Sequence, residues 1–297
     1  MAMMRAMSSG VAGLKAHQTA LDVIGNNVAN VNTYGFKASR TLFSDVLYQT
    51  LSSATKPDAA TGQGGSNPSQ VGYGSTASSV AVDTGRAGMA TTGFSGDCYI
   101  NGEGYFVIGS GTPTDAVPSS YQYTRVGACS FDSAGYLVDG NGNYVCGTTN
   151  ATPADLTGDV EDIDSATKPG YIHYTPSDTL TLSDISIASD GMITATTGSG
   201  SVVKVGKIAL AHFANPAGLE QKGGNYYSAT ENSGTATYAA PGSGSTGGLV
   251  TGALESSNVD LANEFSNMIT TERGYQANSK IITVADTMLE TLVNMVR

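Results

Sequence analysis

Apolar side chains near the C-terminus recur at the period of a helix that packs against another helix. Six residues with large, mostly apolar side chains stand seven positions apart, namely Leu261, Met268, Tyr275, Ile282, Leu289 and Val296. Phe265 and Ile269 widen this stripe. The pattern predicts a long helix that reaches the last residue and carries a one-sided face of the coiled-coil type.

A similar stripe runs along the N-terminal end. Its members alternate in steps of four and three, with Gly25 at the skipped position: Met7, Val11, Leu14, Gln18, Leu21 and Val28. We therefore expect terminal helices within residues 1–33 and 255–297, each on the order of 30 to 40 residues and about 45–60 Å long. A one-sided stripe needs a partner, and the opposite terminus is the nearest one. The alternative is that both helices pack on the central domain.

The start of the C-terminal helix carries two candidate signals. Ser257 and Asp260 are spaced as a capping box, and Asn258 is an alternative N-cap. Either signal marks the start of the C-terminal helix.

The middle of the chain has the short alternating runs and turn residues of antiparallel strands. Hairpin signals stand at Asn101-Gly102, Ser133-Ala134-Gly135, Asp139-Gly140-Asn141-Gly142, Asp190-Gly191 and Gly198-Ser199-Gly200. The predicted fold class is α+β, in which the paired terminal helices flank an antiparallel β domain over residues 90–240. Residues 34–89 and 241–254 are predicted connectors, and an acidic insertion lies near 150–170.

Charge and cysteine content exclude several classes of protein. The 297 residues carry a net charge of −11, which argues against nucleic acid, because its binding requires basic side chains. Cys98, Cys129 and Cys146 provide no paired metal spacing and no disulfide framework. They are either three buried thiols or one bridge and a thiol. The chain shows no secretory signal peptide and no run of about 18 apolar residues, so these features alone predict a cytoplasmic protein.

Motifs that resemble catalytic or metal sites fail on spacing or context. His17, His173 and His212 are far apart. Asp139–Asn143 begins like a calcium loop, but Tyr144 and Asn150 stand where that loop needs Gly and Glu. The GxGxxG match at 242–247 lies in a linker, and the acidic cluster around Glu161 is typical of a solvated loop. We therefore predict no enzyme, no cofactor, no metal and no catalytic residue.

The ends of the chain resemble those of bacterial flagellar rod and hook proteins. The N-terminal signature consists of Asn26, Asn27, Ala29, Asn30, Thr33, Gly35, Phe36 and Lys37. The C-terminal segments Ser257–Leu261 and Gln276–Lys280 are similar to the matching end, and "YINGEGYFVIG" to the family's β domain. Within the family, residues 64–74 are similar to the hook protein, whereas "FSDVLYQT" is similar to the distal rod protein.

The resemblance implies that the terminal helices pair in the inner layer of a helical tube. Asn side chains bond backbone groups and end helices, so Gly35 is the expected helix stop and Phe36 the anchor of the next segment. We also expect Asn26, Asn27, Asn30 and Asn32 to bond neighbouring subunits. The full set of predicted assembly residues is Leu14, Leu21, Asn26, Asn27, Asn30, Asn32, Gly35, Phe36, Asn258, Leu261, Phe265, Met268, Tyr275, Asn278, Ile282 and Leu289.

The resemblance also implies a function and a location. We expect a structural subunit of the flagellar hook, exported without a cleaved signal and polymerised into a flexible tube that transmits torque. Expected partners are the chain itself, the rod, the hook–filament junction and hook cap proteins, and the export apparatus. The alternatives are the distal rod protein and, from another class, a secreted β-rich adhesin or hydrolase with oligomerising helices.

Overall fold

A computed structural model describes residues 2–56, 64–111, 117–150, 160, 162–163, 168–175, 182–198 and 200–295. The chain divides into two compact units. The helical unit comprises Met1–Val31, Ala38–Asp83 and Val259–Arg297, and the β unit comprises Asn32–Lys37 and Thr84–Asn258.

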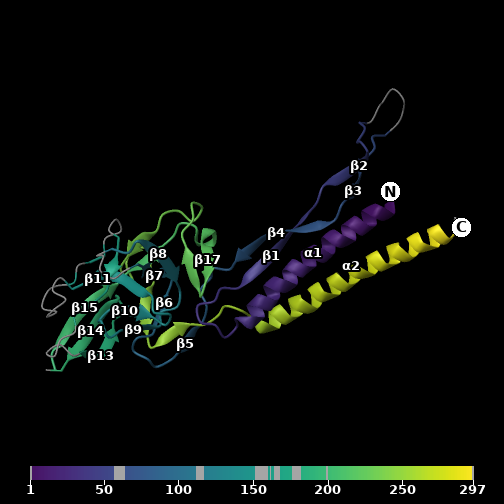
Figure 1. The fold of residues 1–297 in the computed structure, drawn as a ribbon. Coiled ribbons are helices and arrows are strands. Elements are labelled where there is room, and N and C mark those ends of the chain that lie inside the picture. Colours follow the sequence, from purple (N-terminus) through teal and green to yellow (C-terminus); the bar gives the residue numbers. More distant parts are fainter. Residues whose placement is uncertain are drawn as a thin grey trace. The chain divides into compact units, whose positions relative to one another are not determined.

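Two long helices form the frame of the helical unit. Helices α1 (Ala2–Ala29) and α2 (Leu261–Met295) lie side by side and antiparallel, as the purple and yellow ribbons of Figure 1 show. The predicted N-terminal helix, β-rich centre and C-terminal helix are thereby confirmed. The cap of α2 differs from both candidate signals, because Asp260 is the N-cap: its carboxylate accepts a hydrogen bond from Ala262 N at 2.9 Å. The prediction of Asn258 as the cap was wrong, since Asp260 stands directly before the first helical residue.

The helices approach each other closely at glycines. A Cβ atom built on Gly13 would lie 2.7 Å from Asn278 Nδ2, and one on Gly274 would lie 2.7 Å from His17 Cε1. Both distances are shorter than those that real Cβ atoms make with other heavy atoms. The absence of a side chain at these two positions therefore sets how near α1 and α2 come.

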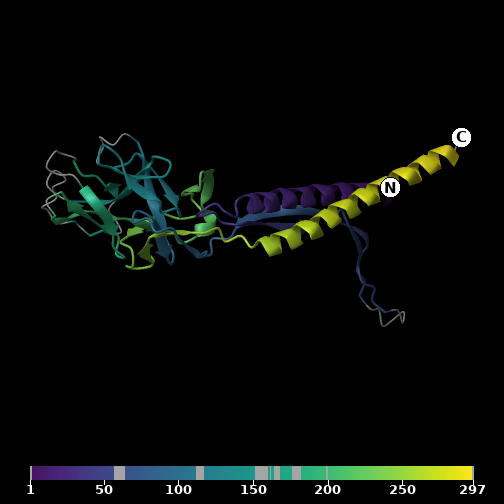
Figure 2. The same cartoon turned by 90° about the horizontal axis from the view of Figure 1, so that it is seen from below.

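The segment between α1 and the β unit forms strands. Strand β1 (Ser39–Asp45) pairs antiparallel with β4 (Ser75–Val82), and both pack along α1 (Figure 2). Strand β2 (Tyr48–Ser52) pairs with β3 (Ser69–Gly72) in a separate ribbon. Every residue of β2 is exposed, and a two-stranded ribbon of this kind is only marginally stable in water by itself.

The β unit is built on one large sheet and two short strand pairs. Strand β5 (Met89–Thr91) pairs with β21 (Ala253–Glu255), and β6 (Cys98–Asn101) pairs with β20 (Gly248–Thr251). Within the described residues the large sheet holds thirteen strands: β7 (Tyr105–Ser110), β8 (Ser120–Thr124), β9 (Cys129–Phe131), β10 (Leu137–Asp139), β11 (Tyr144–Thr149), β12 (Gly170–Tyr171), β13 (Leu182–Ile187), β14 (Met192–Thr197), β15 (Val202–Ile208), β16 (Leu210–His212), β17 (Glu220–Gly223), β18 (Tyr226–Ser228) and β19 (Thr237–Ala239).

All ladders among these strands are antiparallel, as predicted. A short 3-10 helix, η1 (Pro216–Gly218), precedes β17. The inward faces of the strands bury one apolar cluster that includes Ile100, Phe106, Ile193 and Ile208. A second cluster is rich in aromatic side chains, among them Tyr105, Tyr123, Phe213 and Tyr238.

Most of the predicted hairpins are present, and one is not. The ladders β9–β10, β10–β11, β13–β14 and β14–β15 confirm four turns. The predicted hairpin at Asn101-Gly102 is wrong, because β6 pairs with β20, whereas β7 pairs with β8. Gly102 has φ +150°, and a Cβ there would lie 2.7 Å from Gly247 Cα. The glycine allows the two backbones to approach closely. In the sequence, a glycine kept for this reason cannot be told from a glycine of a hairpin turn.

The calcium-like stretch is a hairpin turn, as predicted. One carboxylate oxygen of Asp139 accepts hydrogen bonds from the backbone N–H groups of Asn141 and Asn143, both at 2.9 Å. The hydroxyl of Tyr226 accepts from the side-chain amides of the same two residues and donates to the other Asp139 oxygen. These bonds join the Asp139 carboxylate to the backbone of its own turn and to Tyr226.

The three cysteines are thiols, and burial makes them weak acids. Cys98 and Cys146 are buried, and Cys129 is half-buried by surface area. Loss of hydration raises the pKa of the Cys98 thiol to about 12, with a smaller contribution from Asp97. Burial also raises the pKa of Cys129 and Cys146. These side chains therefore behave as small apolar groups.

The predicted acidic insertion lies largely outside the described residues. Asp162 is described, and its carboxylate accepts a hydrogen bond from Lys207 Nζ at 2.7 Å. That contact lowers the pKa of Asp162. No helix in the described part of the chain is long and apolar enough to cross a membrane.

Candidate assembly site

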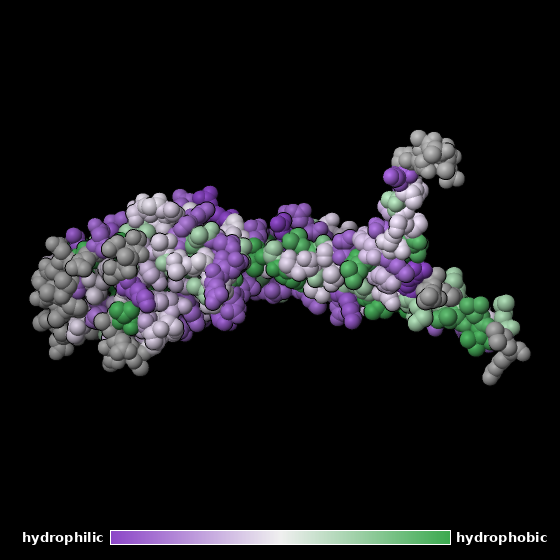
Figure 3. All heavy atoms as spheres, turned by 90° about the horizontal axis from the view of Figure 1, so that it is seen from above, coloured by the Kyte–Doolittle hydropathy of each residue, from purple (hydrophilic) through white to green (hydrophobic). Residues whose placement is uncertain are grey.

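Helix α2 presents its apolar side chains to solvent. Ala285 is its one buried residue among those described. Eleven large apolar side chains of the helix are exposed: Leu261, Phe265, Ile269, Tyr275, Ile281, Val284, Met288, Leu289, Leu292, Val293 and Met295. Apolar (green) surface gathers at the end of the helical unit that holds the chain termini (Figure 3). An exposed apolar face of this extent marks an interaction surface.

The predicted residues of α2 divide between this face and the contact with α1. Leu261, Phe265, Tyr275 and Leu289 are exposed, whereas Met268 and Ile282 are half-buried. On the α1 side, Ile282 Cγ1 would lie 3.3 Å from a Cβ on Gly10, and Asn278 fills the notch at Gly13. The Asn278 amide also donates to Gly274 O of its own helix at 3.0 Å. Asn258, expected to belong to the same set, is half-buried in the β unit.

The buried stripe of α1 is made of smaller residues than the sequence pattern emphasised. Leu14 and Leu21 are half-buried, and Val11 is exposed. Over residues 4–29, the buried positions of the helix are Gly10, Gly13, Ala16, Ala20, Ile24 and Asn27. This stripe also follows steps of three and four, so it could have been found by searching for small residues at helical spacing. Small side chains allow close contact between helices. The larger side chains of Val11, Leu14 and Leu21 remain at least partly exposed and can contact another molecule.

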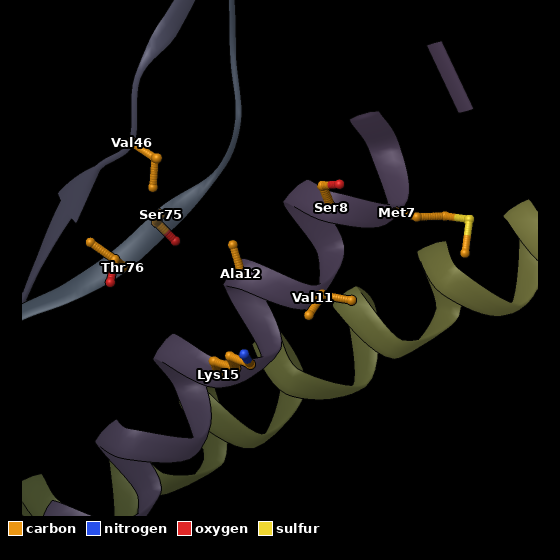
Figure 4. A pocket seen from close by; sticks show the side chains of 8 residues that line it. All are labelled: Met7, Ser8, Val11, Ala12, Lys15, Val46, Ser75 and Thr76. Atoms are coloured by element: carbon orange, nitrogen blue, oxygen red, sulfur yellow. The ribbon is translucent and has the colours of Figure 1, made fainter. Parts of the chain in front are cut away.

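A groove opens between α1 and the β1–β4 ladder. It has a volume of about 610 Å³. Figure 4 shows its lining, which consists of Met7, Ser8, Val11, Ala12, Lys15, Val46, Ser75 and Thr76. Apolar and small polar groups line it, with Lys15 as the charged member, so the groove offers shape for packing and lacks the convergent carboxylates of a hydrolase.

The asparagines at the end of α1 bond backbone groups, as expected of that residue type. Asn30 Nδ2 donates to Asn26 O at 2.9 Å and so satisfies a carbonyl in the last turn. Asn27 Oδ1 accepts from Ser39 N at 2.9 Å, and Asn27 Nδ2 donates to Ser39 O at 2.7 Å. Asn27 is therefore buried and bonded within its own chain. Asn26 and Asn32 are exposed.

Gly35 is not the stop of α1, which ends at Ala29. Its N–H donates to Glu255 O at 2.8 Å, and its φ is +69°. A Cβ at this position would lie 2.7 Å from Val126 Cγ2. Gly35 therefore serves a tight docking turn within the β unit, and neighbouring Phe36 is half-buried there.

Three charged side chains next to this turn form a buried cluster that the sequence analysis did not select. Lys37 Nζ donates to Glu255 Oε1 at 2.6 Å and to Gly85 O at 2.8 Å. Arg125 Nη1 lies 3.5 Å from Glu255 Oε2. The side chains of Lys37 and Glu255 are 1% exposed and that of Arg125 4%. A signal was available, since Lys37 closes the N-terminal signature and Glu255 precedes the C-terminal one.

The histidines are spread over both units. His17 packs against Phe43 with a ring separation of 5.8 Å, His173 stacks on Tyr136 at 5.3 Å, and His212 lies 3.1 Å from a Glu103 oxygen. Over the described ranges, no group of three or more His, Cys, Asp or Glu side chains is arranged to hold a metal ion.

Comparisons with known proteins match both ends of the chain and its β unit. Residues 7–37 match the model "Flagella basal body rod protein", residues 99–195 match "Flagellar hook protein FlgE/F/G D1 domain", and residues 250–295 match "Flagellar basal body rod FlgEFG protein C-terminal". The flagellar basal-body rod protein FlgG of Bacillus subtilis is 40% identical over 99% of this chain and 100% of its own length. The chain belongs to the flagellar rod and hook protein family.

Other rod and hook proteins show the same relation at lower identity. FlgG of Caulobacter vibrioides is 35% identical over 97% of each chain. The flagellar hook protein FlgE of Treponema pallidum is 27% identical over 99% of this chain. In this rod and hook family member, the matched terminal segments contain α1 from Met7 onward, the docking turn at Gly35, Glu255 and α2.

Proposed function

We propose that this chain is a structural, non-enzymatic subunit of the flagellar rod–hook axis and polymerises through its two terminal helices into a helical tube. The exposed apolar face of α2 carries the proposal. A helix of 35 residues with one buried side chain gains little stability inside its own subunit, because most helical stability in proteins comes from packing an apolar face. Copies of the same chain supply such a face repeatedly, and heterologous contacts that do not close produce helical polymers.

In the proposed tube, α1 and α2 form an inner layer with coiled-coil packing. The large residues of the heptad stripes, such as Leu14, Leu21 and Leu289, pack between copies, since the small residues of α1 already make the contact within the subunit. Asn26 and Asn32 bond neighbouring subunits, and the β units form the outer layer. Partners beyond the chain itself are adjoining flagellar parts: the rod, the hook–filament junction, the hook cap and the export apparatus. The location is the flagellum, outside the cytoplasm.

The hook and the distal rod are both candidate positions for the subunit, and the length of the alignments speaks for the distal rod. The match to the Bacillus subtilis rod protein spans 299 aligned positions, which is close to the 297 residues of this chain. The matches to hook proteins of Treponema pallidum and Borreliella burgdorferi span 472 and 449 positions, so those proteins carry long insertions that this chain lacks. The hook-like segment at residues 64–74 favours the hook.

Electron microscopy of the purified chain under assembly conditions tests both parts of the proposal. Straight, rigid tubes support the distal rod, and curved tubes support the hook. Met288→Asp and Leu292→Asp place charges on the exposed face of α2 and should abolish tubes while the β unit melts unchanged. Gln276→Asp adds the same charge at an exposed polar position of the same helix and should leave tubes intact. Tubes of normal length from both charged variants would contradict the assembly role of this face.

A further inference from the structure

A short peptide leaves the helical unit, docks in the β unit and returns. Residues 32–37 belong to the β unit, although residues 1–31 and 38–83 on either side belong to the helical unit. Asn225 Nδ2 donates to Tyr34 O at 2.9 Å, and Gly35 N donates to Glu255 O at 2.8 Å. Lys37 ends the peptide with its charge buried. The chain thus has a docked segment directly after α1.

A second docked segment stands directly before α2. Strand β21 pairs with β5, and Ser256 N donates to Gly88 O at 2.9 Å. The Glu255 carboxylate accepts a hydrogen bond from Ala87 N at 3.0 Å in addition to the bond from Lys37. Glu255 therefore connects its own strand to the 85–89 segment and to the peptide that follows α1.

The charges of the cluster make these contacts interdependent. Lys37 and Arg125 are two buried cations on one carboxylate. Arg125 has further support from Gly102 O at 2.9 Å and from the ring of Tyr105 at 5.1 Å. Loss of Glu255 removes the carboxylate that both buried cations contact. Loss of Lys37 leaves Arg125 with that carboxylate. The two losses are therefore unequal, because the first breaks two buried ion contacts and the second breaks one, and removing one partner of a buried pair is costly.

We propose that Lys37, Glu255 and Arg125 form an ion lock that fastens the segments next to α1 and α2 to the β unit as a pair. In its mechanical role the lock rests on the proposed function. A side-chain bond and a backbone bond join the two segments directly, so the lock is a second connection between the terminal helices beside their direct contact at Gly13 and Gly274. The sheet of the β unit lies outside that connection.

Hydrogen exchange on the full-length monomer tests the pairing. Lys37→Met removes one side of the lock and should speed exchange at least tenfold at Gly35, and also at Ala87 and Ser256, which belong to the other segment. If only residues 34–38 change, the two segments dock independently and the lock is refuted. Lys222→Met breaks the exposed Lys222–Glu220 pair and should leave all these amides unchanged.

A suppressor test uses the difference in stability cost between losing the shared carboxylate and losing one of its two cations. Glu255→Gln should lower the urea midpoint of the β unit more than Lys37→Met does, and the double variant should be more stable than Glu255→Gln alone. If the loss of urea midpoint in the double variant equals the sum of the losses in the two single variants, the charge argument is overturned. If Glu255→Gln does not fold, Lys37→Met and its exchange pattern still decide the question.

A mechanical readout separates a force-bearing lock from an ordinary stabilising pair. When a single full-length molecule is stretched between its termini, α1 and α2 should separate first, and the lock should then yield as an event of its own before the sheet unfolds. Lys37→Met should shift the lock event to lower force without changing the force that unfolds the sheet. A lock event unchanged by Lys37→Met rejects the force path. The exchange and stretching measurements use monomers, so they are independent of tube formation. If the unsubstituted chain forms tubes but Lys37→Met leaves hydrogen exchange unchanged, the lock is rejected and the assembly role stands. If Lys37→Met changes exchange as expected but the unsubstituted chain forms no tubes, the assembly role is rejected and the lock stands.

Discussion

The side chain of Asn27 acts as a strand neighbour for Ser39. Its amide oxygen accepts from Ser39 N at 2.9 Å and its amide nitrogen donates to Ser39 O at 2.7 Å. The two groups are those that a paired strand would satisfy, and they stand at the first residue of β1. One asparagine near the end of α1 therefore fixes where the first strand begins, which explains why a good helix contains so polar a residue.

Asn27→Ala should destabilise the helical unit by about 2–3 kcal/mol, because it leaves both backbone groups of Ser39 without their partner. Urea unfolding followed by circular dichroism at the helical signal measures the change. Asn26→Ala, at an exposed position of the same turn, should change stability by less than about 0.5 kcal/mol. Equal effects of the two substitutions would show that the Ser39 contact contributes nothing specific.

Gly25→Ala should raise the stability of the helical unit, whereas Gly13→Ala should not. Both substitutions gain about 1 kcal/mol of helix propensity. The new Cβ at Gly25 meets nothing within 4 Å, whereas the one at Gly13 would lie 2.7 Å from Asn278 Nδ2. Overpacking of that kind typically costs about 1–3 kcal/mol, so Gly13→Ala should be neutral to destabilising while Gly25→Ala stabilises α1. Thermal melting followed by the helical circular dichroism signal distinguishes the two variants. If both are stabilised, the packing of α1 against α2 does not depend on the absence of a side chain at Gly13.

Gly35→Ala should loosen the docked peptide far more than Gly93→Ala does. Both glycines have positive φ, +69° and +77°, so each substitution carries a similar backbone strain of about 1–2 kcal/mol. A Cβ on Gly93 meets nothing, but one on Gly35 would lie 2.7 Å from Val126 Cγ2. Limited proteolysis around residues 32–38 measures the difference. Equal cleavage of the two variants would contradict the close approach at Val126.

Stability of the β unit should fall as the pH rises above about 9. The folded state raises the pKa of the Cys98 thiol from 9.0 to about 12 by burial. Between those values the unfolded chain has lost the proton and the folded chain keeps it, so each pH unit costs up to about 1.4 kcal/mol for this thiol. Urea midpoints from pH 8 to pH 11 measure the slope. Cys98→Ala should make the slope of urea midpoint against pH shallower, even if it lowers the midpoint at pH 8. An unchanged slope would show that ionisation of Cys98 does not cause the loss of stability.

The family and the order of elements are encoded locally. The long C-terminal helix and the hairpin turns at Asp139 and Asp190 each depend on residues close together in sequence, and each formed where the sequence indicated. The predicted assembly residues remain a proposal, although the exposure of Leu261, Phe265 and Leu289 agrees with a surface left for other copies.

The tertiary structure alone decided the features that depend on distant segments. Gly35, Gly102 and Gly13 look alike in the sequence, but one docks against Val126, one against Gly247 and one against Asn278. Lys37 and Glu255 are 218 positions apart, and although each adjoins a terminal signature, neither local sequence shows that the two charges meet. Periodicity and turn chemistry report on the nearest few residues, whereas a buried ion pair or a glycine notch exists only once the chain has brought its far parts together.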